Sequence, residues 1–524
     1  MKTLSSFFCF YKMIRCFLSL ILLFLAFTVH SQEIHFTPLE SGNERGMTYD
    51  IIGRAGRNLM IYRSFKNDHS ISLYNDSMQP VRKIDLTFLP RQLVKVDFIN
   101  TNEVVYLFYQ FVQKDILFCN MAIFNTEARL ISEPAIVDSL ILDDPRKMKV
   151  FNFIANAAKS HIMTYSKTVE NEQVVKIKTS LYDKKMSLVD KTDMLIVSPN
   201  GADMLREFQL DNNGNLIFFR GVLNEESGIL TRADVLIKPF SQDTVKFTTI
   251  RVNDLAVREM RLQTDNTNNT VIAAALFGSG SRIDIAGVFT LTIDILNNNI
   301  LAGNPLFFSD SLREESKLPT ISKRSTFNDY VIDEIIPYKN GGYALLIERR
   351  VAEGSRYPGA GFRFFSDNLL SPSIVLSGMS GYAPLFSTFG GPGDAFRQPI
   401  DQRSFVKNTA GNLLLVSLNP QGELTDIQML RKEQVEENSS DLISYTTIRT
   451  SSGLRLMFNE KERGALLPNM VAYVPGNRLK RLPSFKNLVP NFRFMMRKGI
   501  QTGPAESIIP CVTSSYISFV KVKF

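Results

Sequence analysis

The chain has 524 residues, of which 44% are hydrophobic, 21% charged and 10% aromatic, a composition that excludes intrinsic disorder and a coiled coil. It contains no Trp and only four His, so the composition disfavours histidine-based catalysis and histidine-rich metal sites. The net charge of +8 is not concentrated in Lys/Arg runs with interleaved aromatic residues, so we do not expect nucleic acid as a partner.

Residues 1–31 have the pattern of a cleaved secretory signal peptide. Three basic residues precede an apolar run from Phe17 to Val29, and Val29-His30-Ser31 suits a signal peptidase site. The run is shorter than the roughly 20 residues that a membrane-spanning helix needs. We therefore expect an exported protein, in the periplasm, at the cell surface or secreted, whose mature chain has no transmembrane segment. Cleavage removes three positive charges and no negative one, which lowers the net charge from +8 to +5.

One unit recurs through the mature chain: a short apolar stretch, a tight turn of Asn, Gly, Ser or Ala, and a second, more apolar stretch. Residues 206–219 align with 258–275, and residues 334–347 align with 507–520. Further turns are predicted near Ala55, Asn102, Ala158, Ala410 and Ser452. The pattern predicts nine hairpins.

Most copies continue with a third apolar stretch, a short polar turn and a fourth stretch, as in 121–127 and 235–241. Four-stranded antiparallel meanders repeated in this way bury both faces when they are stacked radially. The repeat therefore resembles the β-propeller superfold, without the Trp-containing signature of a named family. We predict an all-β protein in which one propeller fills residues 32–524, with eight blades, or seven as the next choice. Residues 33–39 are expected to supply a closing strand, and the copy near Ala410 is too close to the next one to hold a full blade.

An outer-membrane β-barrel is the second alternative, because the chain is predicted to be exported and ends in Phe524 after an alternating pattern. The second stretches count against it, since 104–108 and 271–277 are continuous apolar runs that predict burial on both faces.

Three insertions are expected on one face of the propeller, where ligand sites usually lie: 307–330 between blades five and six, 350–361 within blade six, and 377–402 between blades six and seven. The last two combine glycine with arginine and aromatic residues, and arginine forks bind carboxylate or sulfate. The hypothetical ligand-binding residues are Arg350, Arg356, Tyr357, Phe396 and Arg397. The alternative is that these loops pack only on one another.

Charged pairs begin the first stretch of three copies and are expected at the mouth of the central channel: Arg206, Glu207, Arg258, Glu259, Asp333 and Glu334. Crowded carboxylates can act as acid/base groups or ion ligands, but such a ring is more often a salt-bridge network.

Four smaller predictions follow from local patterns. Asp211-Asn-Asn-Gly-Asn215 lacks the spacing of a calcium loop and predicts a plain turn. Cys119 and Cys511 lie in apolar runs and predict buried thiols. Residues 432–437 predict a short loop helix. No spacing indicates a metal site or a cofactor.

These observations favour an exported, non-catalytic binding or scaffolding propeller of the cell envelope whose partner is a protein or a glycan-like or anionic ligand. The alternative function is a propeller hydrolase or lyase that acts on polysaccharide.

Overall fold

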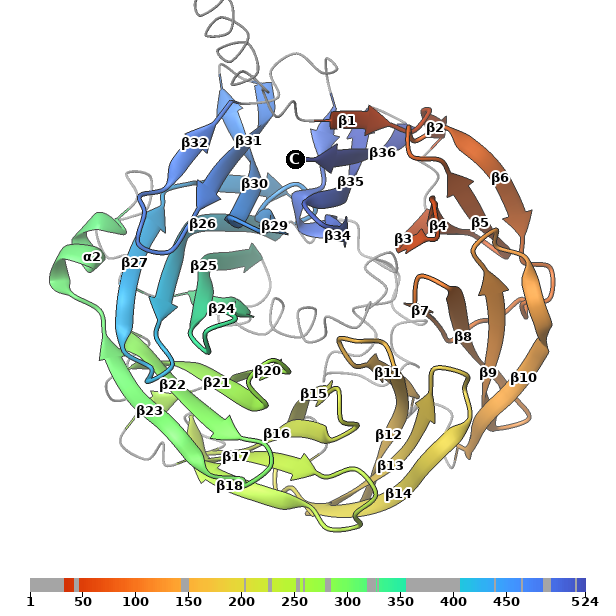
Figure 1. The fold of residues 1–524 in the computed structure, drawn as a ribbon, viewed down its shortest axis with the longest axis horizontal. Helices are drawn as coiled ribbons and strands as arrows, with labels where there is room; N and C mark the ends of the chain where they lie inside the picture. The colour runs from red at the N-terminus through yellow and green to blue at the C-terminus, as the bar shows by residue number, and fades with distance from the viewer. Residues whose placement is uncertain are drawn as a thin grey trace, which may run out of the picture.

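The computed structural model shows a ring of eight small antiparallel sheets around a central axis, which is a β-propeller with eight blades (Figure 1). It describes residues 33–41, 47–142, 150–201, 204–224, 229–250, 255–257, 260–278, 284–317, 327, 329–354, 406–437, 440–462, 465–483, 492–513 and 516–524. The predicted signal peptide lies outside these residues. No helix in the described part of the chain has the length and apolarity to cross a membrane.

The first four blades each consist of four consecutive strands, of which the first is innermost and the fourth outermost. Blade one contains β3 (Met47–Ala55), β4 (Asn58–Phe65), β5 (Asp68–Tyr74) and β6 (Pro80–Asp85); blade two contains β7 (Lys95–Asn100), β8 (Val104–Gln113), β9 (Ile116–Asn125) and β10 (Leu130–Ile141). Blade three contains β11 (Asn152–Ala155), β12 (His161–Asn171), β13 (Val174–Asp183) and β14 (Leu188–Val197); blade four contains β15 (Leu205–Leu210), β16 (Leu216–Leu223), β17 (Leu230–Lys238) and β18 (Lys246–Ile250).

The other blades repeat this order with additions. Blade five contains β19 (Ala256–Val257) and β20 (Arg261–Asp265), then β21 (Thr270–Gly278), β22 (Ile285–Asp294) and β23 (Ile300–Phe307), and is followed by helix α2 (Asp310–Glu315). Blade six contains β24 (Tyr330–Pro337), β25 (Tyr343–Gly354), β26 (Val406–Leu418), β27 (Leu424–Leu430) and β28 (Gln434–Glu437). Blade seven contains β29 (Tyr445–Thr450), β30 (Gly453–Glu462), β31 (Ala465–Tyr473) and β32 (Lys480–Leu482).

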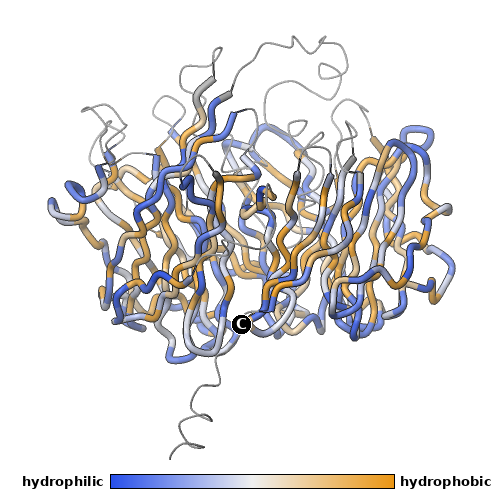
Figure 2. The backbone as a smooth tube through the Cα atoms, turned by 90° about the horizontal axis from the view of Figure 1, so that it is seen from above, coloured by the Kyte–Doolittle hydropathy of each residue, from blue (hydrophilic) through white to orange (hydrophobic). Residues whose placement is uncertain are grey.

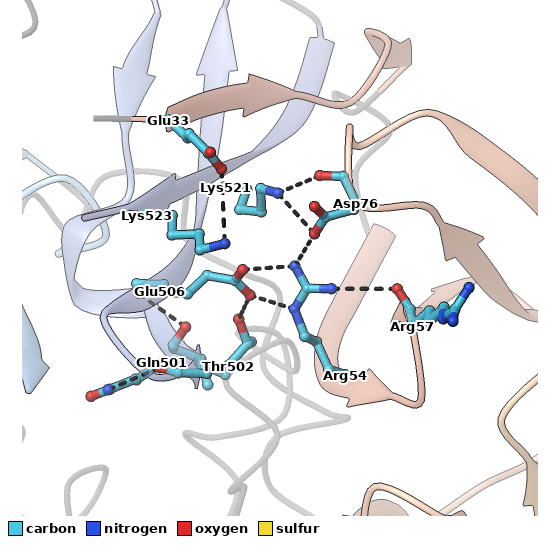
Figure 3. Close-up of polar contacts among 12 residues, drawn as sticks. Glu33, Arg54, Arg57, Asp76, Gln501, Thr502, Glu506, Lys521 and Lys523 are labelled. Atoms are coloured by element: carbon cyan, nitrogen blue, oxygen red, sulfur yellow. Dashed lines mark hydrogen bonds and ion pairs between the residues drawn. The ribbon is translucent and has the colours of Figure 1, made fainter. Parts of the chain in front are cut away.

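Blade eight joins the two ends of the chain. It contains β33 (Arg493–Phe494), the short helix η4 (Met496–Lys498), β34 (Ile500–Gly503), β35 (Glu506–Thr513) and β36 (Tyr516–Lys523), with β1 (Glu33–Phe36) and β2 (Glu40–Ser41) paired on β36 as the outermost strand. The prediction that residues 33–39 supply a closing strand is thus confirmed. Blade one is also linked to blade eight by ion pairs: Arg54 binds Glu506 at 2.5 and 2.7 Å, and Lys521 binds Asp76 at 3.0 Å (Figure 3).

The core lies between the blades rather than within one central mass. Each of eight clusters of buried apolar side chains is shared by two consecutive blades. The second strands alternate between two clusters: Val271 and Ala273 of β21 face blade four, whereas Ile272 faces blade six. This alternation confirms the prediction that the continuous apolar runs are buried on both faces. Cys119 and Cys511 are buried free thiols, as predicted.

Polar residues form the tight turns by accepting backbone hydrogen bonds. In the turn at Asp211–Asn215, the Asp211 carboxylate accepts the backbone N–H groups of Asn213 at 2.9 Å and Asn215 at 2.7 Å, and Gly214 adopts a φ of +84°. This geometry supports the predicted plain turn. The same device recurs at Asn125, Asp183 and Asn419, where each side chain accepts the N–H of the residue four positions later.

The turn predicted near Ala410 is wrong. Residues 406–418 form one strand, β26, whose two halves both pair with β25. The Gly411-Asn412 signal marks a shift of register, because Glu348 pairs with Leu413 whereas Arg350 pairs with Ala410. A β-bulge uses the same residues as a turn but continues the strand. Consequently, the predicted insertion at 377–402 lies within blade six, between β25 and β26, and not between blades six and seven.

Two further local predictions are wrong. Residues 434–437 form strand β28, not a helix, because they pair with the half of β26 that extends beyond β27. The hairpin at residues 507–520 joins the second and third strands of blade eight, whereas 334–347 joins the first and second strands of blade six. The two segments therefore do not occupy equivalent positions in their blades, and their predicted alignment is wrong. The chain therefore has eight blades despite nine predicted hairpins.

The two faces of the ring differ because successive strands run antiparallel. Connections between blades, and those between second and third strands, emerge on one face, which we call the connection face. Turns between first and second strands emerge on the other, where the C-terminus also lies (Figure 2). The connections that contain the three predicted insertions begin and end on the connection face, but residues 318–326 and 355–405 themselves lie outside the described residues. In the first of these connections, α2 begins at Ser309, whose side chain accepts the N–H of Leu312.

Candidate functional site

The innermost strands place polar side chains at one level of the central channel. Asp50, Asp97, Asn152, Arg261 and Thr446 each pair with the fifth residue of the second strand of their own blade. Because equal register on equivalent strands means equal height, these residues form one layer around the axis, toward the connection face. We call it the channel layer.

Glu207 and Asp333 join the channel layer through irregularities in their strands. The register of β15 shifts between Arg206 and Gln209, and Glu207 within the shift has a φ of +57°. The register of β24 shifts between Ile332 and Glu334, which brackets Asp333. Bulges of this kind redirect side chains and are frequent beside functional sites.

Glu207 takes part in an ion pair between blades four and five. The guanidinium Nη1 of Arg261 lies 3.1 Å from Glu207 Oε1, and the backbone N–H of Leu262 donates to Oε2 at 3.2 Å. Arg261 Nε also donates to the carbonyl oxygen of Ile332 in blade six at 3.2 Å. The Glu207 carboxylate thus bridges blades four and five.

Blade six and the segment that leads to blade seven contribute a second, larger group of buried and partly buried polar residues, which we call the blade-six cluster: Asp333, Glu348, Arg350, Lys432 and Ser444. Glu348 is fully buried and lies 2.5 Å from both Arg350 Nε and Lys432 Nζ, while Ser444 donates to it at 2.7 Å. Arg350 Nη2 lies 2.5 Å from Asp333 Oδ2. Burial alone would raise the pKa of Glu348, but Lys432 and Arg350 outweigh it and lower the pKa to about 2.

The blade-six cluster holds a guanidinium group that lacks one partner. Among the described residues, Arg350 Nη1 is buried and has no hydrogen-bond partner. Arg497 of η4 adds a further cation beside the cluster; it is partly exposed and donates to Ser440 at 3.1 Å. Burial, together with the positive charge of Arg350, lowers the pKa of Arg497 to about 10, so it stays protonated at neutral pH. The arrangement favours binding of an anion.

Asp50 is the contrasting carboxyl of the channel layer. It is completely buried, and neither oxygen accepts a well-formed hydrogen bond from the described residues. Burial raises its pKa to about 7, the negative charge of Asp97 adds to the rise, and the backbone of Ile51 opposes it. Asp97 is buried too, but Lys95 Nζ lies 3.3 Å from its Oδ2. Asp50 can therefore hold a proton near neutral pH, as a general acid must.

The described residues include five of the eleven predicted site residues. Arg350 was predicted in an inserted loop, but β25 continues to Gly354, so Arg350 lies inside a strand, where it binds Asp333. Glu334 binds Arg449 of blade seven at 2.5 Å, and Arg206 lies in β15 beside Glu207. The other six lie outside the described residues: Arg258, Glu259, Arg356, Tyr357, Phe396 and Arg397. Their proposed roles stay predictions.

Sequence reasoning missed Asp50, Asp97, Glu348, Lys432 and Arg497. The predicted channel residues are charged pairs at the start of a strand, whereas Asp50 and Asp97 are single carboxyls inside apolar stretches. A lone carboxyl in an apolar strand is itself a signal of a buried, perturbed group. Lys432 and Arg497 carry no comparable signal, because their partners are distant in sequence.

Neither family models nor curated proteins match this sequence. Solved structures match only distantly. A PL25 ulvan lyase bound to a saccharide of GlcA and Rha3S has 10% identity over 80% of this chain and 90% of its own, with a TM-score of 0.37. The polysaccharide lyase Uly1 has 9% identity over 93% and 90%, with a TM-score of 0.37. A europium-containing methanol dehydrogenase has 8% identity over 93% of each chain, with a TM-score of 0.38. At these TM-scores the likeness carries no functional inference.

Proposed function

We propose that this protein is an exported, non-catalytic binding propeller that holds an anionic ligand, an acidic glycan, on its connection face near blades six to eight. The observation that carries the proposal is the buried Arg350 Nη1, which has no hydrogen-bond partner within the described part of the chain, near the partly exposed Arg497. A buried guanidinium N–H without a protein acceptor calls for an oxygen atom from water or ligand. Carboxylate and sulfate groups fit an arginine fork.

The charges of the blade-six cluster support an anion over a cation. Among the described residues, the cations Arg350, Lys432, Arg497 and Lys498 supply four positive charges against the three carboxylates of Asp333, Glu348 and Asp441. Arg350 and Lys432 hold the carboxylates of Asp333 and Glu348 at 2.5 Å, so these two are poorly placed to serve as acid/base groups. This favours a binding site over a catalytic one.

The test is binding of heparin and hyaluronate, with neutral dextran as the control polymer, measured by calorimetry at two salt concentrations. We expect the anionic polymers to bind and dextran not to bind. Arg497→Gln should weaken binding at least about tenfold. Its matched control is Arg481→Gln, which removes an exposed arginine of β32 paired with Glu460 at 2.7 Å. Equal affinity of the Arg497→Gln variant and the wild type would contradict the proposal.

Asp50 favours a second candidate, a hydrolase or lyase acting on polysaccharide. Its buried carboxyl, with a pKa near 7, matches what a general acid requires at neutral pH. Size-exclusion chromatography of each polymer before and after incubation separates the two functions. Unchanged polymer length supports the binding role, whereas cleavage that is lost in Asp50→Asn supports the enzyme.

A further inference from the structure

The outermost strand of a propeller blade leaves a row of backbone N–H and C=O groups unpaired within its sheet, and proteins normally protect such an edge. In blade two, β10 contains Pro134 and three shifts of register. In blade five, β23 contains Pro305, and in blade one β6 begins at Pro80 and carries Arg82 and Lys83. Proline, bulges and charge are the usual means of blocking edge-to-edge pairing.

Strand β14 of blade three lacks proline, and its exposed charges, Lys191 and Asp193, are of opposite sign. It spans ten residues, Leu188–Val197, contains no proline or glycine, and pairs with β13 without a shift from Val197 to Asp190. Its side chains alternate strictly over the second half of the strand: Thr192, Met194 and Ile196 are buried, whereas their neighbours are exposed.

The odd-numbered residues of β14 are all exposed and form a partly self-complementary pattern. In order they are Val189, Lys191, Asp193, Leu195 and Val197, and Leu195 and Val197 are 68% and 54% exposed; Leu188, at the start of the strand, is exposed as well. Reversing the strand about Thr192 exchanges Lys191 with Asp193 and Val189 with Leu195. A second strand of the same sequence, laid antiparallel about this point, therefore places each Lys191 opposite an Asp193 and each Val189 opposite a Leu195, while Val197 lies opposite Ser187.

The backbone orientation of β14 suits the same arrangement. The N–H of Ser198 donates to the carbonyl oxygen of Gln173 at 2.7 Å, in the same register as the β13–β14 ladder. In an antiparallel ladder such bonds involve alternate residues, so the even-numbered residues of β14 direct their backbone groups toward β13. The odd-numbered residues, from Val189 to Val197, then direct theirs to the free edge.

We propose that β14 pairs antiparallel with β14 of a second copy of this chain, about a two-fold axis through Thr192. Lys191 then lies opposite Asp193 of the partner subunit, and Val189 lies opposite Leu195 of the partner subunit. The two blades join into one continuous eight-stranded sheet, with hydrogen bonds between odd-numbered residues across the axis. Such an interface is isologous, so it closes as a dimer.

The pairing uses groups that are already exposed. Asp193 lies 2.8 Å from Lys176 of β13, and both side chains are substantially exposed, so this surface pair leaves the carboxylate able to accept a further ammonium group. Opposite charges and apolar side chains directly across two strands stabilise an antiparallel pair, and like charges destabilise it. The arrangement is independent of the proposed ligand site.

Sedimentation equilibrium of the purified protein tests this dimer. The wild type should dimerise, and Lys191→Asp should raise the dimer dissociation constant at least about tenfold, because it places two pairs of like charges across the interface. The double variant Lys191→Asp/Asp193→Lys should restore the dimer, since the swapped charges again face opposite charges. Lys83→Asp, on the exposed edge of blade one, is the matched control and should have no effect.

Cross-linking gives a second, geometric readout. Only residue 192 meets its own copy across the proposed axis, at a Cβ separation of about 4.5–5.5 Å that a disulfide can bridge. Thr192→Cys should therefore form a disulfide-linked dimer on mild oxidation, whereas the more exposed Val197→Cys should not. A wild type that stays monomeric up to its solubility limit overturns the proposal, and so does a Lys191→Asp dimer of unchanged affinity.

Discussion

Asp50 and Glu348 are both fully buried carboxyl groups near the central channel, yet their pKa values move in opposite directions. In blade one, no described cation lies against Asp50, and burial raises its pKa to about 7. In blade six, Lys432 and Arg350 lie 2.5 Å from Glu348 and lower its pKa to about 2. Both carboxyl groups are thus equally buried, and the presence or absence of a neighbouring cation decides whether the group is ionised or protonated near neutral pH.

The two regions therefore differ in what their charges can do. Asp50 of blade one can hold a proton, whereas the blade-six cluster, together with Arg497, Lys498 and Asp441 beside it, carries a net positive charge among the described residues. The proposed anion site belongs to the second region. The four predictions below test this comparison, from the largest expected effect to the smallest.

Lys432→Met should have the largest effect on stability. It leaves Glu348 buried with one cation fewer, and breaking a buried ion pair in this way costs about 3–5 kcal/mol. Urea unfolding at neutral pH measures the change. Lys83→Met, which removes an exposed lysine, provides the control. If the two variants are equally stable, Lys432 does not compensate the charge of Glu348.

Asp50→Asn should stabilise the protein at high pH. The folded-state pKa of about 7 lies above the unfolded value of 3.8, so the wild type loses stability as the pH rises from about 4 to about 7 and stays destabilised above it. Removing the charge stabilises the protein by about 2–3 kcal/mol at pH 8, after subtraction of about 1–2 kcal/mol for the amide's own unmet hydrogen bonds; at pH 4 mainly that cost remains, so the variant is about 1–2 kcal/mol less stable than the wild type. Thermal unfolding at the two pH values measures this difference.

The opposite outcome for Asp50→Asn is equally informative. If the variant is less stable than the wild type at pH 8, the Asp50 carboxylate must be ionised and compensated by a group on a neighbouring blade. Glu348→Gln provides the matched comparison, because its lowered pKa predicts a stabilising contribution that is present above about pH 4.5 and is lost as the pH falls toward 2.

Glu506→Gln should have a moderate effect, because the Arg54–Glu506 pair at the closure of the ring is partly exposed on the Arg54 side (Figure 3). Loss of a bidentate ion pair at a half-buried site should lower the free energy of unfolding by about 1–2 kcal/mol. Chemical denaturation gives the value. A loss as large as that for Lys432→Met would show that closure of the ring, rather than burial of charge, governs stability.

Lys317→Ala should have the smallest effect. Lys317 lies 2.5 Å from Glu314 at the end of α2, but both side chains are more than half exposed. Exposed pairs at this spacing contribute less than about 0.5 kcal/mol. A melting temperature within error of the wild type is expected, and a drop of several degrees would mean that the helix packs on the ring through this pair.

The sequence predicted the propeller because each copy of the repeat shows two features that a propeller blade requires. A second strand such as β21 alternates Val271 and Ile272 between two neighbouring blades, so it must be apolar throughout, whereas its turns need Asn, Asp or Gly. Both signals are local and repeat eight times. The eight blades and the closing strand at residues 33–36 followed from that repetition.

The sequence-based predictions were wrong where the same local sequence pattern is compatible with two different structures. Gly411-Asn412 has the composition of a turn, and only the pairing of both halves of β26 with β25 shows that it is a bulge. Residues 434–437 have helical propensity, but the free edge of β26 turns them into a strand. In both places a partner that is distant in sequence overrides local preference.

The sequence by itself therefore determined the strand pattern, the number of blades and which strands are buried on both faces, since each depends on residues close together in the chain. The tertiary structure alone decided which charges meet. Glu348 pairs with Lys432, and Asp50 meets no described cation, although nothing in their local sequences distinguishes a compensated from an uncompensated carboxyl. Electrostatic partners are set by distances between strands that are far apart in the sequence, and those distances exist only once the blades have formed.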